Sequence, residues 1–119
     1  MRNTDITAER LAALDYELLQ AEMAHLSGSY GLEMKHLERA HILSQPHALP
    51  HMKTHYLMLR CGKRRQDWRE ILGQICRMLA AAPASVFGIY PVGNPGSSRI
   101  SAFEPVPLPK DLKRYFSPD

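Results

Sequence analysis

The sequence predicts an all-α fold: four antiparallel helices paired as two hairpins, followed by an ordered C-terminal tail rich in proline and glycine. Three observations favour this fold. Apolar residues recur at helical spacing in four successive segments. Helix-breaking residues separate these segments. Gly28 and Gly62 lie 34 residues apart, which indicates that the two hairpins repeat one structural unit.

The first two helices are bounded by local signals. Helix one is expected to begin after one of three residues that can cap an N-terminus, Thr4, Asp5 or Thr7. Its apolar stripe comprises Ile6, Leu11, Leu14, Leu18 and Met23. The helix is expected to end at Ser27-Gly28-Ser29. Helix two is predicted over about residues 30–43, with three residues facing inward, Leu37, Ala40 and Leu43.

The third helix is predicted from about Ala48 or Pro50 to Arg60, because proline is tolerated in a first helical turn and Gly62 can end the helix. The fourth is predicted over about residues 67–82, with Pro83 marking its exit. Five of its residues are expected to face the core: Trp68, Ile71, Leu72, Ile75 and Leu79. Cys76 falls within the same periodicity, so we expect an inert core thiol there.

The composition changes after Pro83, because residues 84–119 hold six of the nine prolines. We expect a single domain of residues 1–119, with a helical core over 5–82 and a tail over 83–119 that wraps back over the core. Apolar residues within the tail argue against disorder. A loop at residues 93–98 is expected to turn the chain back towards the helices, and a short helix is predicted from about Lys110 to Tyr115.

The paired helices and their 34-residue period resemble tetratricopeptide repeats. In the first unit, Ala21 and Ala40 occupy positions where the helices of such a repeat approach most closely. By the same offset, His55 and Gln74 occupy the corresponding positions of the second unit. A buried polar side chain needs a hydrogen-bond partner. A hydrogen bond between His55 and Gln74 is one explanation, and a bound ligand is the other.

The charge balance excludes some classes of function. With a formal net charge of +3 and a pI of about 9.0, the chain is only mildly basic. A basic group lies near the second hairpin turn, but no recognition-helix pattern or ladder of stacking aromatic residues accompanies it, which argues against nucleic-acid binding. No apolar run approaches membrane-spanning length.

The cysteine content indicates a reducing compartment. Cys61 and Cys76 are the only two cysteines. If a helical hairpin turns near residue 64 or 65, they lie roughly 11 Å apart along the helix axis, too far for a disulfide. We therefore expect two free thiols. The opening residues do not resemble a signal peptide, and we expect a bacterial-type cytoplasm.

Four polar residues on helices two and three are expected to face one another: Glu38, His41, His51 and His55. Residues three or four apart share a helix face. The run Ser44-Gln45-Pro46 breaks the helix between the two pairs. If the chain turns near residue 46 or 47, Glu38 lies level with His55, and His41 lies level with His51 or Met52.

Three imidazoles and a carboxylate on facing helices are typical of a metal site for zinc, iron, nickel or copper. A di-iron centre would require more carboxylates than this cluster contains. The competing interpretation is a buried polar network, in which His41 bonds to a backbone carbonyl and Glu38 bonds to His55, Arg39 or Arg77. The sequence leaves both interpretations open.

A second polar stripe consists of Glu70, Gln74 and Arg77, at spacings of four and three residues on helix four. The stripe could be a charge pair linked through Gln74, or a solvated face laced with salt bridges. It could also extend the histidine cluster, because Gln74 is level with His55 about the second hairpin turn.

Four motifs are characteristic in combination: His36-Leu37-Glu38-Arg39-Ala40-His41-Ile42-Leu43-Ser44-Gln45, His51-x-x-x-His55-x-x-Met58-Leu59, Trp68-Arg69-Glu70-Ile71-x-Gly73-Gln74-x-x-Arg77, and Pro91-x-Gly93-Asn94-x-Gly96. Together they resemble a small bacterial family known as domain of unknown function 3703. The resemblance covers roughly residues 9–112 and implies one compact domain. It implies no particular activity.

The leading functional hypothesis is transition-metal binding by His41, His51, His55 and Glu38, for metal sensing, storage or delivery in the cytoplasm. The competing hypothesis is a non-enzymatic adaptor whose concave helical face binds a protein or peptide. Two repeats are few for an independent solenoid, which favours homodimerisation or capping by the tail. A metal-dependent enzyme is a third interpretation, and it requires an open coordination position and a pocket.

Overall fold

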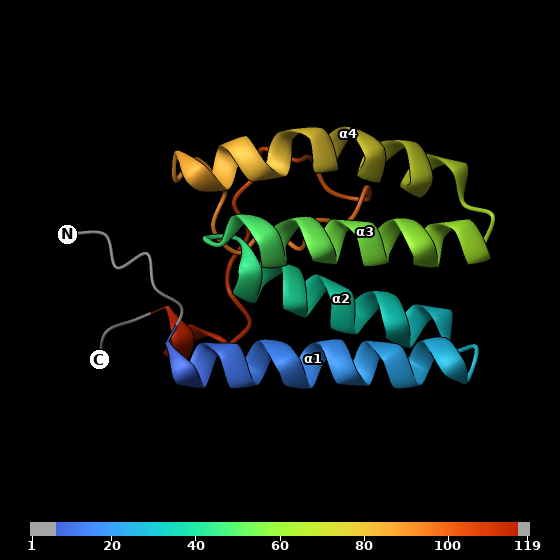
Figure 1. Ribbon diagram of the computed structural model, residues 1–119, viewed down its shortest axis with the longest axis horizontal. Helices are drawn as coiled ribbons and strands as arrows, with labels where there is room; N and C mark the ends of the chain where they lie inside the picture. The colour runs from blue at the N-terminus through green and yellow to red at the C-terminus, as the bar shows by residue number, and fades with distance from the viewer. Residues whose placement is uncertain (1–6, 117–119) are drawn as a thin grey trace.

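The computed structural model describes residues 7–116, and within them every regular element is a helix. Four α-helices and a short 3-10 helix follow one another: α1 (Ala8–Leu26), α2 (Tyr30–Ser44), α3 (Ala48–Arg64), α4 (Trp68–Val86) and η1 (Lys113–Tyr115). Figure 1 shows the four long helices side by side in chain order, with the chain reversing direction from each to the next. The all-α prediction is confirmed for the described residues, and the relation to tetratricopeptide repeats stays a prediction.

Helix α1 begins at a single cap, because the Thr7 hydroxyl accepts a hydrogen bond from the backbone N–H of Arg10 at 3.1 Å. The other predicted caps and Ile6 lie outside the described residues. At the other end, Gly28 adopts a φ of +75°, and the N–H of Ser29 donates to the carbonyl of Ala24 at 2.9 Å. This left-handed closure favours glycine and ends the helix where the sequence predicts.

Helix α3 runs past Gly62 to Arg64, which corrects the prediction that Gly62 ends it. A Cβ on Gly62 would lie 3.1 Å from both Cβ and Cγ of Glu70. The glycine therefore lets α3 and α4 approach closely and does not cap the helix. The closure falls four residues later, where Gln66 has a φ of +54° and the Asp67 N–H donates to the Gly62 carbonyl.

Helix α4 continues through Pro83 to Val86, so the prediction that Pro83 marks its exit is wrong. A proline close to a helix end removes one backbone donor without preventing a last turn. Gly88, at a φ of +67°, ends the helix instead, and the Ile89 N–H donates to the Ala84 carbonyl at 2.7 Å.

The face that α4 turns inward is also different from the predicted one. The side chains of Trp68, Leu72 and Leu79 are 71%, 61% and 79% exposed. Glu70 and Gln74 are buried in their place. Cys76 is exposed as well, which corrects the expectation of a core thiol. Glu70 and Gln74 can face inward because both side chains find hydrogen-bond partners there, which removes most of the penalty of burying them.

The core lies mainly between α1, α2 and α3. Leu37, Ala40 and Leu43 of α2 are fully buried, as the periodicity of that helix predicts. They belong to two neighbouring apolar clusters, one formed by Leu14, Ala40, Ile42, Leu43 and Leu112, and the other by Ala21, Met34, Leu37, Met58 and Cys61. Across residues 7–116, none of the helices combines the length and the hydropathy that a bilayer crossing requires.

The segment after α4 returns along the helices and reaches the beginning of α1 (Figure 1). The Gln45 side chain donates a hydrogen bond to the Pro91 carbonyl of this segment at 3.0 Å. Near the C-terminus, Arg39 pairs with Asp111, and Leu112 is buried in the first apolar cluster. The regular helix near the end is a single 3-10 turn, shorter than the predicted one. The tail thus covers the α2–α3 junction, where the polar residues gather.

Candidate metal centre

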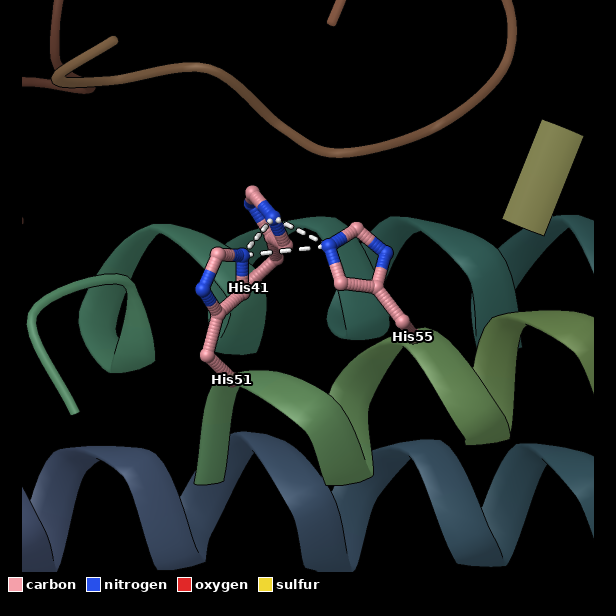
Figure 2. Close-up of side chains that lie close together, drawn as sticks. All are labelled: His41, His51 and His55. Carbon is pink, nitrogen blue, oxygen red and sulfur yellow. Dashed lines mark hydrogen bonds between the residues drawn. The ribbon is translucent and has the colours of Figure 1, made fainter. Parts of the chain in front are cut away.

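Three imidazole rings from two helices converge on one point, as Figure 2 shows. His41 comes from the last turn of α2, and His51 and His55 come from the beginning of α3. Their Nε2 atoms form a triangle with sides of 2.9 Å (His41–His51), 3.1 Å (His41–His55) and 3.1 Å (His51–His55). Each of the three residues is at most 5% exposed. The three rings could hold a metal ion between them.

Local structure explains why these rings meet. His51 and His55 are one turn apart on α3, and therefore project from the same face of the helix. Helix α2 ends at Ser44, and His47 is extended before α3 begins. The chain reverses within these few residues and lays the end of α2 against the start of α3.

The tail fixes the orientation of His41. The Nδ1 of His41 lies 2.8 Å from the backbone carbonyl oxygen of Asn94. A carbonyl only accepts hydrogen bonds, so Nδ1 of His41 carries the proton and donates. In a neutral ring the Nε2 is then unprotonated, and its lone pair points at the other two rings.

Gln74 fixes His55 in the same way. Its Oε1 lies 2.6 Å from Nδ1 of His55. Its Nε2 donates to Oε1 of Glu70 at 2.8 Å and to the carbonyl of Gly96 at 2.9 Å, which sets the orientation of the amide. Nδ1 of His55 therefore donates to Gln74, and the Nε2 of His55 is also unprotonated.

Two bare lone pairs therefore face each other across 3.1 Å, on His41 and His55. The third ring, His51, can donate one proton from Nε2, and this proton can satisfy only one of them. At least one pair of Nε2 atoms in the triangle therefore places two hydrogen-bond acceptors against each other with no proton between them. A cation held by all three Nε2 atoms would remove this conflict, since each lone pair could then bind it.

Burial keeps the three rings in the neutral form that binds metals. Desolvation lowers the pKa of His51 to about 3 and the pKa of His55 to about 4. The pKa of His41 is lowered well below its usual value, first by desolvation and then by the neighbouring His55 and His51. No proton has to leave these rings before an ion binds near neutral pH.

Gly96 packs directly on the His41 ring. It adopts a φ of +85°, and a Cβ at this position would lie 2.5 Å from Cδ2 and 2.7 Å from Nε2 of His41. Any side chain at position 96 would therefore displace the ring. The glycine is required here both for its backbone conformation and for the close approach.

The triad lines a cavity of about 830 Å³ between α4 and the tail. Most of the lining is apolar, including Ala80 and Ala84 from α4 and Tyr90 and Phe103 from the tail. Three ligands from the protein leave at least one coordination position of a transition metal open. All three histidines line the cavity, so a small molecule held there would lie beside the triad.

Glu38, the fourth predicted ligand, does not join the triad. Within residues 7–116, the only group of side chains whose ligand atoms lie close enough to share an ion is the three histidines. Glu38 lines a separate cavity of about 350 Å³. Gly93 and Pro95 line that cavity, whereas Asn94 and Gly96 line the cavity of the triad, so the 93–96 loop passes between the two. Burial is the main factor that raises the pKa of Glu38.

The second polar stripe partly extends the histidine cluster. Gln74 joins Glu70 to His55, as one of the sequence-based interpretations expects. The second carboxylate oxygen of Glu70 accepts from the Ser98 N–H at 3.0 Å and from the Ser98 hydroxyl. Arg77 does not pair with Glu70 among the described residues, and its Nη2 donates to the Ile100 carbonyl at 2.8 Å. The stripe therefore binds the tail and orients one histidine.

Sequence reasoning missed the contribution of the tail to the site. Asn94 and Gly96 are 53 and 55 residues away from His41, and the loop that contains them is predicted only to make a turn. The available signal is the pair of glycines around one asparagine, because Gly93 and Gly96 both need positive φ values, of +81° and +85°. Such a loop can present backbone carbonyls at fixed directions.

Comparison with known proteins supports the family resemblance of the sequence motifs. A family model described as Protein of unknown function (DUF3703) matches residues 8–116. No curated protein and no solved structure matches the chain. The matched range includes all four long helices, the three histidines and the 93–96 loop. Because the match extends over nearly the whole sequence, this chain belongs to the DUF3703 family.

Proposed function

We propose that this protein binds one divalent transition-metal ion through His41, His51 and His55, and that it senses, stores or delivers that ion. One observation carries the proposal. The Nε2 lone pairs of His41 and His55 face each other at 3.1 Å, each fixed by an acceptor on the far side of its ring. A buried pair of acceptors is costly, and a shared cation makes the arrangement favourable.

Zinc is one ion that suits the triangle. Zinc–nitrogen bonds measure about 2.0–2.1 Å, and the sides of 2.9–3.1 Å bring the three nitrogens close enough for one zinc ion to bind them all. Zinc is usually four-coordinate, so three histidines would leave it one further ligand position. Iron, nickel and copper also bind imidazole, and the cellular supply of each ion contributes to the choice.

An exchangeable site supports sensing, storage or delivery. Structural zinc sites are closed by four protein ligands, whereas the described residues supply three here. The ion would therefore keep a position through which it could exchange. We place this role in the cytoplasm, which is consistent with the free thiols of Cys61 and Cys76.

Elemental analysis tests the proposal. Untagged protein is purified without chelator, and zinc, iron, nickel and copper are measured per chain. We expect close to one equivalent of metal in the wild type and its loss in His51→Ala/His55→Ala. His36→Ala is the matched control, since His36 bonds to Glu17 outside the triad. Metal-free wild-type protein whose thermal unfolding does not respond to any of the four ions would refute the proposal.

A second candidate function is self-association through the exposed face of α4, with the protein acting as an interaction module. Trp68, Leu72, Ile75 and Leu79 are all exposed, and their spacings of four, three and four residues form one apolar stripe. We propose a second copy of the chain as the partner, because a stripe with this spacing can pack against itself across a two-fold axis. The tetratricopeptide-like arrangement would suit such a module.

The mass of the protein in solution tests this second function. Size-exclusion chromatography with light scattering should give a dimer that Leu72→Arg converts to a monomer. Leu26→Arg is the control, since Leu26 is also exposed but lies at the end of α1. A wild-type monomer at all accessible concentrations would exclude the homodimer and direct attention to a different protein partner.

A further inference from the structure

The cavity beside the three histidines is large enough for an organic ligand. Its volume of about 830 Å³ lies within the range of known small-molecule sites. Ala80 and Ala84 line it on the side of α4, and Ile89, Tyr90 and Phe103 line it on the side of the tail. A ligand that fills this space must have an apolar body, because the walls offer few hydrogen-bonding groups.

The charges around the cavity favour an anionic head group. Three neutral imidazoles leave the full charge of a bound ion uncompensated. Arg77 lines the same cavity, and its Nε and Nη1 are buried without a hydrogen-bond partner in the described part of the chain. The nearby carboxylate of Glu70 is already engaged by Gln74 and Ser98. An anion beside the triad would therefore be attracted by two positive charges, that of the ion and that of Arg77.

We infer that this cavity binds a small carboxylate with an apolar chain or ring. The carboxylate occupies the open coordination position of the ion, and the hydrocarbon part lies between α4 and the tail. The inference rests on the proposed function, because the ion supplies the main contact of the head group. Arg77 stabilises the bound anion through its charge, since the residue lines the cavity and its Nε and Nη1 are buried without a hydrogen-bond partner among the described residues.

Calorimetric titration of the zinc-loaded protein with three probes tests the inference. Octanoate carries both features, acetate carries only the head group, and 1-octanol carries only the chain. We expect one octanoate per zinc, with an affinity at least about tenfold above that of acetate, because the longer chain buries additional methylene groups. We expect 1-octanol to bind the zinc form at least about tenfold more weakly than octanoate does. We expect the same loss when octanoate is added to the metal-free protein.

Two variants locate the ligand. Arg77→Met should lower the octanoate affinity about tenfold while one zinc per chain is retained, because a buried positive charge is lost. Arg69→Met, an exposed arginine on the same helix, should leave the affinity unchanged. Ala80→Trp should fill part of the cavity and weaken octanoate more than acetate.

The possible failures are distinguishable. If the protein binds one zinc but octanoate does not bind, or binds no better than 1-octanol, the carboxylate inference is overturned and the metal site stands. If octanoate binds to both Arg77→Met and Ala80→Trp as tightly as to the wild type, its site is elsewhere and the inference is also overturned. If the wild type binds no metal at all, both the proposed function and the carboxylate site are refuted.

Discussion

His41 is oriented by a residue 53 positions further along the chain, since its Nδ1–H donates to the backbone carbonyl of Asn94 at 2.8 Å. Asn94 is itself held in place, because its side-chain amide donates to the carbonyls of Ser101 and Glu104 at 2.8 and 2.7 Å. Its Oδ1 accepts from the N–H of Gly96 at 2.9 Å. A loop in the tail thereby sets the direction of a lone pair on α2, and partners of this kind tune metal affinity.

Gly96→Ala should weaken metal binding. A methyl group at this position would lie 2.5–2.7 Å from the His41 ring, and the φ of +85° is unfavourable for alanine. We expect zinc affinity, measured by competition with a chromophoric chelator, to fall about 10- to 100-fold, as for other changes that misplace a ligand.

Gly31→Ala is the matched control for this change, because nothing lies within 4 Å of a Cβ at Gly31 and its backbone is helical. We expect unchanged zinc affinity for this variant and equal or higher stability, since alanine favours the helix. Equal zinc affinity in the two variants would show that position 96 does not act on His41.

Gln74→Leu should destabilise the metal-free protein. The change removes the acceptor of the buried His55 Nδ1–H and the donor to Glu70. An unsatisfied buried group costs about 1–3 kcal/mol, so urea unfolding should show a loss of about 2 kcal/mol or more. Gln20→Leu, at a half-buried position on α1, should change stability by less than about 0.5 kcal/mol. Unchanged stability of Gln74→Leu would mean that solvent or another group accepts the hydrogen bond from His55.

The stability of the metal-free protein should fall as the pH drops from 6.5 to 5. The pKa values of His51 and His55 in the fold are about 3 and about 4, and the pKa of His41 is also lowered, while unfolded histidines titrate near 6.5. Below pH 6.5 the unfolded chain therefore takes up protons that the folded protein does not. The contribution of the neutral histidines to the free energy of unfolding is fully present above pH 6.5. It falls as the pH drops through the range down to the folded pKa values of about 4 and about 3.

Chemical denaturation in chelator-containing buffers at several pH values measures this loss. The window of 6.5 to 5 lies above the titration of ordinary carboxyl groups, so the histidines dominate it. His51→Phe should make the dependence shallower, by up to about 1.4 kcal/mol per pH unit, since one titrating group is removed. Constant stability across this window would contradict the neutral, buried state of the triad.

The two cysteines should differ sharply in reactivity. Cys76 is exposed, whereas Cys61 is buried, and burial raises the pKa of its thiol to about 12. Because the thiolate is the reactive form, an aromatic disulfide reagent should modify one thiol per native chain quickly and the second only on unfolding. Cys76→Ser should abolish the fast phase. Rapid modification of two thiols in the native wild type would show that the α3 core opens readily.

Helix α4 shows where the apolar pattern misleads. Its residues Trp68, Leu72 and Leu79 have helical spacing, and the sequence alone favours their burial. The periodicity identifies the helix and its apolar face correctly, but it does not say what that face contacts. Contacts with other segments decide which face of α4 points inward. Gly62 has no side chain and therefore leaves room for Glu70. Gln74 forms a hydrogen bond with His55, and Glu70 accepts one from Ser98. These contacts satisfy Glu70 and Gln74 and leave the apolar stripe exposed.

The sequence by itself determined the four helices, the inward face of α2 and the two cysteines as free thiols, because these follow from spacing within one element or a short turn. It also placed three histidines on facing helix surfaces. Only the tertiary structure decided that Glu38 belongs to another cavity and that Asn94, Gly96 and Gln74 orient the rings. The physical reason is that hydrogen-bond direction and cavity shape depend on contacts between residues far apart in the chain, which no local periodicity encodes.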